Sequence, residues 1–133
     1  MKKIFFIAVI TLLGGKLAQA QQSNLSPVNQ VKQGYNQTRA NTDYSMIYLK
    51  NISVTDTQKP QVNKIILNYL DAKRTLALAN KQDLSVYRQQ QPALFNDFKT
   101  KLATVLSSQQ MSAFLASKPP LDGKRNLLRG LFY

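Results

Sequence analysis

Aspartate provides every acidic side chain of this 133-residue sequence, which contains no glutamate, no histidine and no cysteine. The usual general base, the thiol nucleophile and the imidazole and thiolate ligands of zinc are therefore absent. Catalysis by paired carboxylates would need two aspartates to meet, but they are scattered and mostly stand at expected helix caps or solvent faces. We predict that the protein is not an enzyme and binds no cofactor. The aspartates are Asp43, Asp56, Asp71, Asp83, Asp97 and Asp122.

Soft metal ligation would depend on Met46 and Met111, because the third methionine, Met1, falls in an N-terminal segment that we expect to be removed. Both methionines lie on the apolar stripes of expected helices, where methionine usually fills a core. We therefore predict no metal site.

The first twenty residues have the pattern of a cleaved signal peptide. Lys2 and Lys3 are followed by the apolar run 4–13 and by the small-x-small sequence 18–20. That run is too short to span a bilayer, which needs roughly 20 apolar residues. We expect export, cleavage after Ala20, and a periplasmic or secreted location. Cleavage would leave one domain of 113 residues with 15 lysines and arginines, six aspartates and a net charge of +9.

Apolar residues recur at spacings of three and four along four segments, 28–49, 62–77, 84–106 and 111–115, as on one side of a helix. Strand signals are nearly absent, so we predict an all-α fold. The apolar side of the short fourth segment carries Met111, Phe114 and Leu115.

Two residues interrupt these stripes. Pro92 should break an ordinary helix, yet Leu84 and Tyr87 lie on the same stripe as Leu94, which favours one kinked helix over two separate ones. Lys73 is the one charge on the stripe of the second segment. We expect its stem to pack there while its amine reaches water.

Two stretches, 54–58 and 106–110, repeat the same order: an aliphatic residue, a hydroxyl residue, two further residues and glutamine. Each has the chemistry of a capping box, in which the hydroxyl accepts from the backbone N–H three residues later and the glutamine side chain bonds back. We expect these boxes to start the second and fourth helices. Pro60 would fall at the fifth position of the second helix, so this helix alternatively begins at Pro60. The motif residues are Val54, Thr55, Gln58, Leu106, Ser107 and Gln110.

This pair of motifs in a small exported helical chain resembles the LTxxQ-motif family of periplasmic proteins, typified by the Spy and CpxP chaperones. The resemblance covers roughly residues 24–118, within a Spy/CpxP-like domain of residues 21–118, although Val54 replaces leucine and Ser107 replaces threonine. It implies four helices in a bent, elongated hairpin that pairs into a cradle-like homodimer, with the motif residues as caps. It also implies an ATP-independent holdase or envelope-stress protein that binds non-native chains.

A second stripe on the second helix mixes leucines with charges and gives a candidate client surface. Tyrosines near cations on the first helix extend it. Positive charge would raise the encounter rate, and apolar contact would hold the client. The two leucines are equally well explained as buried at a dimer interface. The candidate residues are Arg39, Tyr44, Tyr48, Lys50, Lys64, Leu67, Arg74 and Leu78.

The positive charge indicates an acidic partner. Unfolded or acidic proteins fit this chemistry, whereas nucleic acid is a poor partner for an exported protein. The basic and apolar C-terminal tail, residues 119–133, resembles a segment that docks on an anionic membrane surface or a partner, with a disordered end as the equal alternative. The rival to the holdase is a structural or regulatory envelope protein that binds one specific partner or the membrane surface.

Overall fold

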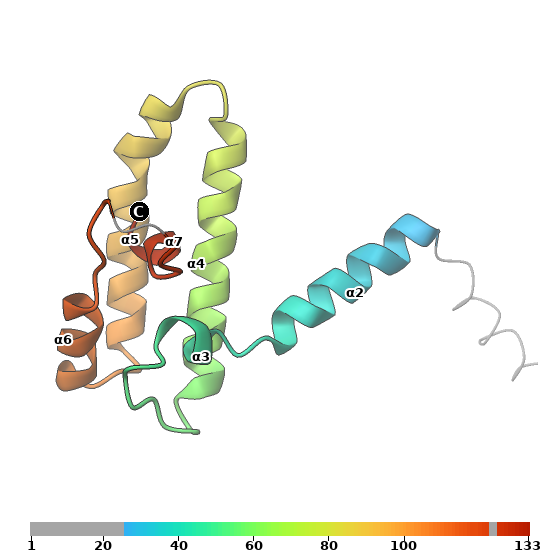
Figure 1. The fold of residues 1–133 in the computed structure, drawn as a ribbon. Coiled ribbons are helices and arrows are strands. Elements are labelled where there is room, and N and C mark those ends of the chain that lie inside the picture. The colour runs from blue at the N-terminus through green and yellow to red at the C-terminus, as the bar shows by residue number, and fades with distance from the viewer. Residues whose placement is uncertain (1–25, 123–124) are drawn as a thin grey trace, which may run out of the picture. The chain divides into compact units, whose positions relative to one another are not determined.

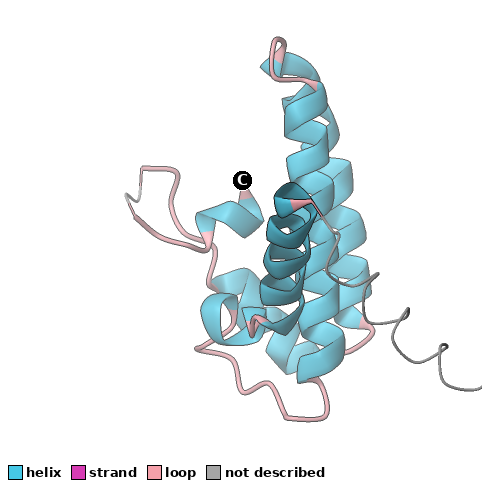
Figure 2. Ribbon diagram, turned by 90° about the vertical axis from the view of Figure 1, so that its right-hand side faces the viewer, coloured by secondary structure: helices cyan, strands magenta, loops and turns pink. Residues whose placement is uncertain are grey.

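The computed structural model describes residues 26–122 and 125–133, and the predicted signal peptide with its cleavage site lies outside these ranges. The described residues form helices joined by loops, without a strand, which confirms the all-α prediction (Figure 2). The described part of the chain divides into two units, with the boundary between Thr38 and Arg39, and the second unit extends to Tyr133. The helices are α2 (Pro27–Asn41), α3 (Tyr44–Tyr48), α4 (Lys59–Ala79), α5 (Leu84–Ala103), α6 (Ser108–Ala116) and α7 (Arg129–Phe132) (Figure 1).

The first predicted helix, 28–49, is in fact two helices. α2 ends at Asn41, and α3 begins at Tyr44 after a cap at Asp43, whose carboxylate accepts from the Met46 N–H at 3.2 Å. An aspartate side chain that bonds the next turn of backbone favours a new helix start over a continuous helix. The local chemistry of Asp43 therefore overrides the apolar periodicity that runs across it.

The core of the second unit lies between α4 and α5, which run antiparallel and side by side (Figure 1). The predicted stripes are confirmed here, because Val62, Ile66 and Tyr69 of α4 are buried in one cluster with Phe98 and Leu102 of α5. The rings of Tyr69 and Phe98 are stacked, with centroids 4.2 Å apart. Stacking of aromatic rings adds to the free energy gained from burial.

α5 passes through Pro92 as one helix, as predicted. Pro92 is exposed, so water can satisfy the carbonyl that the proline leaves without an N–H partner. In the segments 84–106 and 111–115 the stripe prediction is wrong at two positions, because Leu84 and Leu115 are exposed. Leu84 stands next to the turn that joins α4 to α5. Leu115 follows Phe114, which takes the buried side of the short helix α6.

The C-terminal segment completes the core, an outcome that the sequence did not predict. α7 lies between α4 and α5 in Figure 1, and its Leu131 and Phe132 side chains are buried. The Phe132 ring stacks on Phe114 with centroids 5.0 Å apart, and the Tyr69 hydroxyl donates to the Leu131 carbonyl at 2.7 Å. The expectation of a disordered end is wrong for residues 125–133. Leu131 and Phe132 face the core and not a membrane or a partner.

Lys73 takes part in this arrangement. Its amine donates to the Gly130 carbonyl at 2.8 Å and lies 5.6 Å from the centroid of the Tyr69 ring. Burial lowers the pKa of the Lys73 amine. The stem packs as expected and the amine lies at the surface, where it also links α4 to α7.

Candidate functional site

The aspartates mainly hold helices in place. Two of them cap helices and three form ion pairs. Within the described residues, no group of three or more acidic, histidine or cysteine side chains is placed to hold a metal ion. None of the helices in these ranges is long and apolar enough to cross a bilayer. The caps are Asp43 and Asp83, and the ion pairs are Asp56 with Lys59, Asp71 with Arg39 and Asp97 with Lys101.

The second predicted capping box is present at the start of α6. The Ser107 hydroxyl accepts from the Gln110 N–H at 3.2 Å, and the Gln110 side-chain oxygen accepts from the Ser107 N–H at 2.8 Å. Both bonds satisfy backbone groups that a helix terminus leaves without a partner. Leu106, directly before the box, is buried in the core and anchors the entry of the chain into α6.

The first motif makes the same two bonds but does not start its helix directly. The Gln58 side-chain oxygen accepts from the Thr55 N–H at 3.0 Å, and the Thr55 hydroxyl accepts from the Gln58 N–H at 3.3 Å. This box closes a turn, and α4 begins one residue later, at Lys59. Pro60 is therefore the second residue of α4. A backbone N–H at this position has no acceptor within the helix, so proline loses no helical hydrogen bond there. Both predicted starts of this helix, at the motif and at Pro60, were slightly misplaced.

The two motifs bind each other through their glutamines. The Gln58 and Gln110 side-chain amides form a reciprocal pair in which each nitrogen donates to the other oxygen at 3.0 Å. The Gln58 nitrogen also donates to the Val105 carbonyl at 2.8 Å, and the Gln110 nitrogen to the Ser53 carbonyl at 2.6 Å. Each of these carbonyls stands two residues before the hydroxyl residue of the opposite motif. The arrangement thus has local two-fold symmetry, which we call the glutamine clamp.

The glutamine clamp gives the motifs a structural role beyond capping. It joins the turn before α4 to the start of α6, which are 52 residues apart in sequence. Sequence reasoning found both motifs but missed their contact. The glutamines stand at the same offset in both motifs, which permits this symmetric pair, but the sequence does not state that the two turns meet.

The structure exposes only part of the predicted client surface. The prediction is wrong for Tyr44, which is only 8 % exposed because α3 packs on α4 and turns this ring into the core. Tyr48 and Leu67 are half-buried and pack against the same cluster. Arg39 is half-buried and pairs with Asp71. The other predicted residues, Lys50, Lys64, Arg74 and Leu78, are exposed.

Large apolar side chains are exposed where the sequence predicted core. On α2, Val28 and Val31 are 64 % and 72 % exposed, and Tyr35 is also exposed. On α3, Met46 is exposed as well. The stripe of α2 was visible in the sequence, but a stripe predicts burial only if another element covers it. These side chains are the apolar surface that the sequence analysis assigned to the wrong environment.

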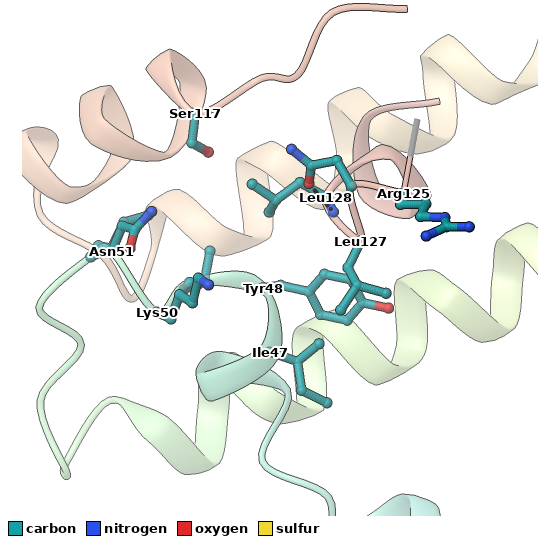
Figure 3. A pocket seen from close by; sticks show the side chains of 11 residues that line it. Ile47, Tyr48, Lys50, Asn51, Ser117, Arg125, Leu127 and Leu128 are labelled. Carbon is teal, nitrogen blue, oxygen red and sulfur yellow. Dashed lines mark hydrogen bonds between the residues drawn. The ribbon is translucent and has the colours of Figure 1, made fainter. Parts of the chain in front are cut away.

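A pocket of about 450 Å³ opens in the second unit between α3, the end of α6 and the segment before α7 (Figure 3). Ile47, Tyr48 and Leu127 form much of its apolar wall, and Lys50 and Arg125 are its cationic side chains. Burial raises the pKa of the Tyr48 hydroxyl, with a smaller contribution from Tyr44. The sequence analysis grouped Tyr48 with Lys50, but it gave no sign that the C-terminal segment would close a pocket over them.

No family model, curated protein or solved structure matches this chain. The resemblance to the LTxxQ-motif family therefore rests on the two motifs alone and stays a prediction. The homodimer that this resemblance implies is likewise a prediction.

Proposed function

We propose that the protein is an exported, ATP-independent binding protein that holds non-native or acidic polypeptide segments, as a chaperone of the holdase type does. The observation that carries the proposal is the exposed apolar side of α2, with Val28, Val31 and Tyr35. Non-native chains expose apolar segments that native proteins bury, and an accessible apolar surface is where such segments bind. Export is supported by the signal-peptide pattern of residues 1–20.

The composition of α2 suits adaptable binding. The helix contains no acidic residue, and Lys32 lies next to Val31. Gly34 makes α2 less stable by about 1 kcal/mol than alanine would at the same position. No close contact requires this glycine, because a Cβ added there would meet nothing within 4 Å. A 15-residue helix of this kind is marginal without an apolar contact, so a bound client would stabilise it.

The charge of the sequence supports the same proposal. Without residues 1–20, its 15 lysines and arginines exceed its six aspartates by nine, a net charge of +9. Such a charge attracts acidic chains over distance, while apolar contact determines how long they stay bound. The proposed mechanism is thus electrostatic encounter followed by apolar retention.

The test is suppression of aggregation. The protein without residues 1–20 is mixed with a chemically unfolded client, and light scattering is followed over time. We expect suppression at a few-fold excess, and we expect Val28→Ser with Val31→Ser to weaken it. The matched control, Gln33→Ser with Gln37→Ser, changes the opposite side of the same helix and should leave suppression intact.

Two results would count against this function. Scattering unchanged at several-fold excess would exclude a holdase. Capture of a single protein from an envelope extract, without suppression, would favour the rival function of a dedicated structural or regulatory subunit. A holdase should instead capture many proteins.

A further inference from the structure

We propose that the pocket between α3 and the segment before α7 binds an amphiphilic carboxylate, a small molecule with one carboxylate on an alkyl chain. Its volume of about 450 Å³ lies within the range of small-molecule sites in proteins. Ile47, Tyr48 and Leu127 line it, and Figure 3 shows Ile47 below Tyr48 and Leu127 in this view. This site is distinct from α2, so the inference does not depend on the proposed chaperone function.

The apolar wall is accessible from solvent. Leu127 is 68 % exposed and Ile47 is 39 % exposed, although both line a concave surface. Tyr48 lies between them and packs its inner side against the core. An alkyl chain laid along this wall would remove Leu127 and Ile47 from water, which is favourable for both partners.

The charge of the pocket selects an anion. Lys50 and Arg125 both line it, and in the view of Figure 3 they lie on opposite sides of Tyr48. No aspartate is among the lining residues. All six aspartates of the sequence lie in the described ranges, and the ion pairs found there use neither of these cations. The pocket therefore combines an apolar wall with positive charge that no lining carboxylate neutralises.

Arg125 is the better anchor for the carboxylate. A guanidinium can bind a carboxylate through two parallel hydrogen bonds, whereas the lysine amine acts as a point charge. Arg125 has a φ of 66°, a left-handed conformation that is uncommon for a residue with a side chain. Such conformations persist where the surrounding structure holds them, and they concentrate at functional sites. Lys50 then contributes electrostatic attraction from the other side of the pocket.

The probe is octanoate, with octan-1-ol and acetate as matched ligands that lack its charge or its chain. Binding is measured by calorimetry and by amide NMR shifts on the chain without residues 1–20. We expect saturable binding of octanoate, with shifts concentrated at Lys50, Asn51, Leu127 and Leu128. Octan-1-ol should bind about tenfold more weakly or worse, the factor expected for one hydrogen bond to a charged group. Acetate should bind more weakly still.

Substitutions then test the site itself. Arg125→Gln and Lys50→Gln should each weaken octanoate binding, with the larger loss at Arg125. The control Arg88→Gln changes an exposed arginine of α5 that does not line the pocket and should leave the affinity unchanged. The NMR spectrum of Arg125→Gln shows whether this substitution disturbs the fold. If it does, the affinity of Lys50→Gln for octanoate and the difference in affinity between octanoate and octan-1-ol test whether the pocket binds the carboxylate.

Three results would overturn the proposal. Equal affinity for octan-1-ol and octanoate would show that charge plays no part. Octanoate shifts scattered over the exposed apolar side chains of other helices would show that there is no single site. Binding to vesicles of anionic phospholipid, without any binding of octanoate, would assign the basic residues to a membrane surface.

Discussion

The glutamine clamp depends on two side chains whose every polar atom has a partner. Removing either amide leaves the backbone N–H and the backbone carbonyl that it bound without those bonds, and an unsatisfied, partly buried polar group costs about 1–3 kcal/mol. We predict that Gln58→Ala and Gln110→Ala each lower the free energy of unfolding by about this amount. Urea denaturation monitored by circular dichroism measures the change.

The double variant distinguishes the clamp from two independent caps. If the glutamines act through each other, Gln58→Ala with Gln110→Ala should cost clearly less than the sum of the single losses, as for residues in one network. Gln109→Ala, an exposed neighbour in the same helix, is the control and should change little. Strictly additive losses would mean that the amide pair contributes nothing of its own.

Asp43 gives the start of α3 a defined pH dependence. Hydrogen bonds, first from the Ser45 hydroxyl and then from the Met46 N–H, hold the pKa of this carboxyl below its ordinary value of 3.8. A lowered folded pKa means that the unfolded chain takes up the proton first. The contribution of Asp43 to stability is therefore complete when the pH is above the ordinary pKa of the carboxyl. It is lost as the pH falls through the lower pKa of the folded state.

We therefore predict a loss of stability in acid that Asp43→Asn reduces. Asparagine retains a capping oxygen but cannot titrate, so the variant should lose less of its melting temperature than the wild type below about pH 4. Melting curves at several pH values measure this. Identical acid dependence of the two proteins would show that Asp43 does not link protonation to folding.

Single residues were predictable from sequence where their chemistry is local. Ser107 and Gln110 could be recognised as a capping box because both partners lie within one turn of backbone. Asp43 is an equally local signal, since aspartate favours a helix start. The apolar stripe that continues across Asp43 led instead to the prediction of a single helix over residues 28–49. The contact between Gln58 and Gln110 could not be derived, because nothing in the sequence states which two turns meet in space.

At the scale of helices, α7 is the element that most changes the interpretation of this chain. Leu131 is fully buried, whereas Leu127, four residues earlier, is mostly exposed. We predict that Leu131→Ala lowers the free energy of unfolding by about 2–5 kcal/mol, the usual cost of a cavity in a core. Leu127→Ala is the matched control and should stay within about 0.5 kcal/mol. Thermal or urea unfolding of the two variants decides between an integral helix and a loose tail.

The helices of the α4 and α5 hairpin were predictable because each buries a stripe against the other. Their spacing of apolar residues and the short turn between them point to the same antiparallel pair. α7 was not predictable in this way, because four residues are too few to show a period. The arginines and leucines of residues 125–133 also match a membrane-surface segment in composition, and the contacts of α7 with the core separate the two, such as the packing of Phe132 on Phe114.

For the whole molecule, the positive charge and two separate apolar surfaces have to be explained together. The side of α2 is open and suits an extended client, whereas the pocket lined by Tyr48 and Arg125 is concave and suits a small ligand. Both place exposed apolar carbon beside lysine or arginine. We therefore propose that apolar contact retains the bound partner and that charge sets the rate of encounter.

The most direct test of this account is the kinetics with which the chain binds a client that cannot refold, such as a reduced and carboxymethylated protein. Stopped-flow anisotropy gives the association and dissociation rates at ionic strengths of about 0.01 M and about 0.15 M, where the Debye length falls from about 30 Å to about 8 Å. We predict that salt slows association far more than it changes dissociation. Val28→Ser with Val31→Ser should speed dissociation and leave association nearly unchanged. We would reject this account if the chain showed no detectable binding. We would also reject it if the variant with Val28→Ser and Val31→Ser released the client at the same rate as the control with Gln33→Ser and Gln37→Ser.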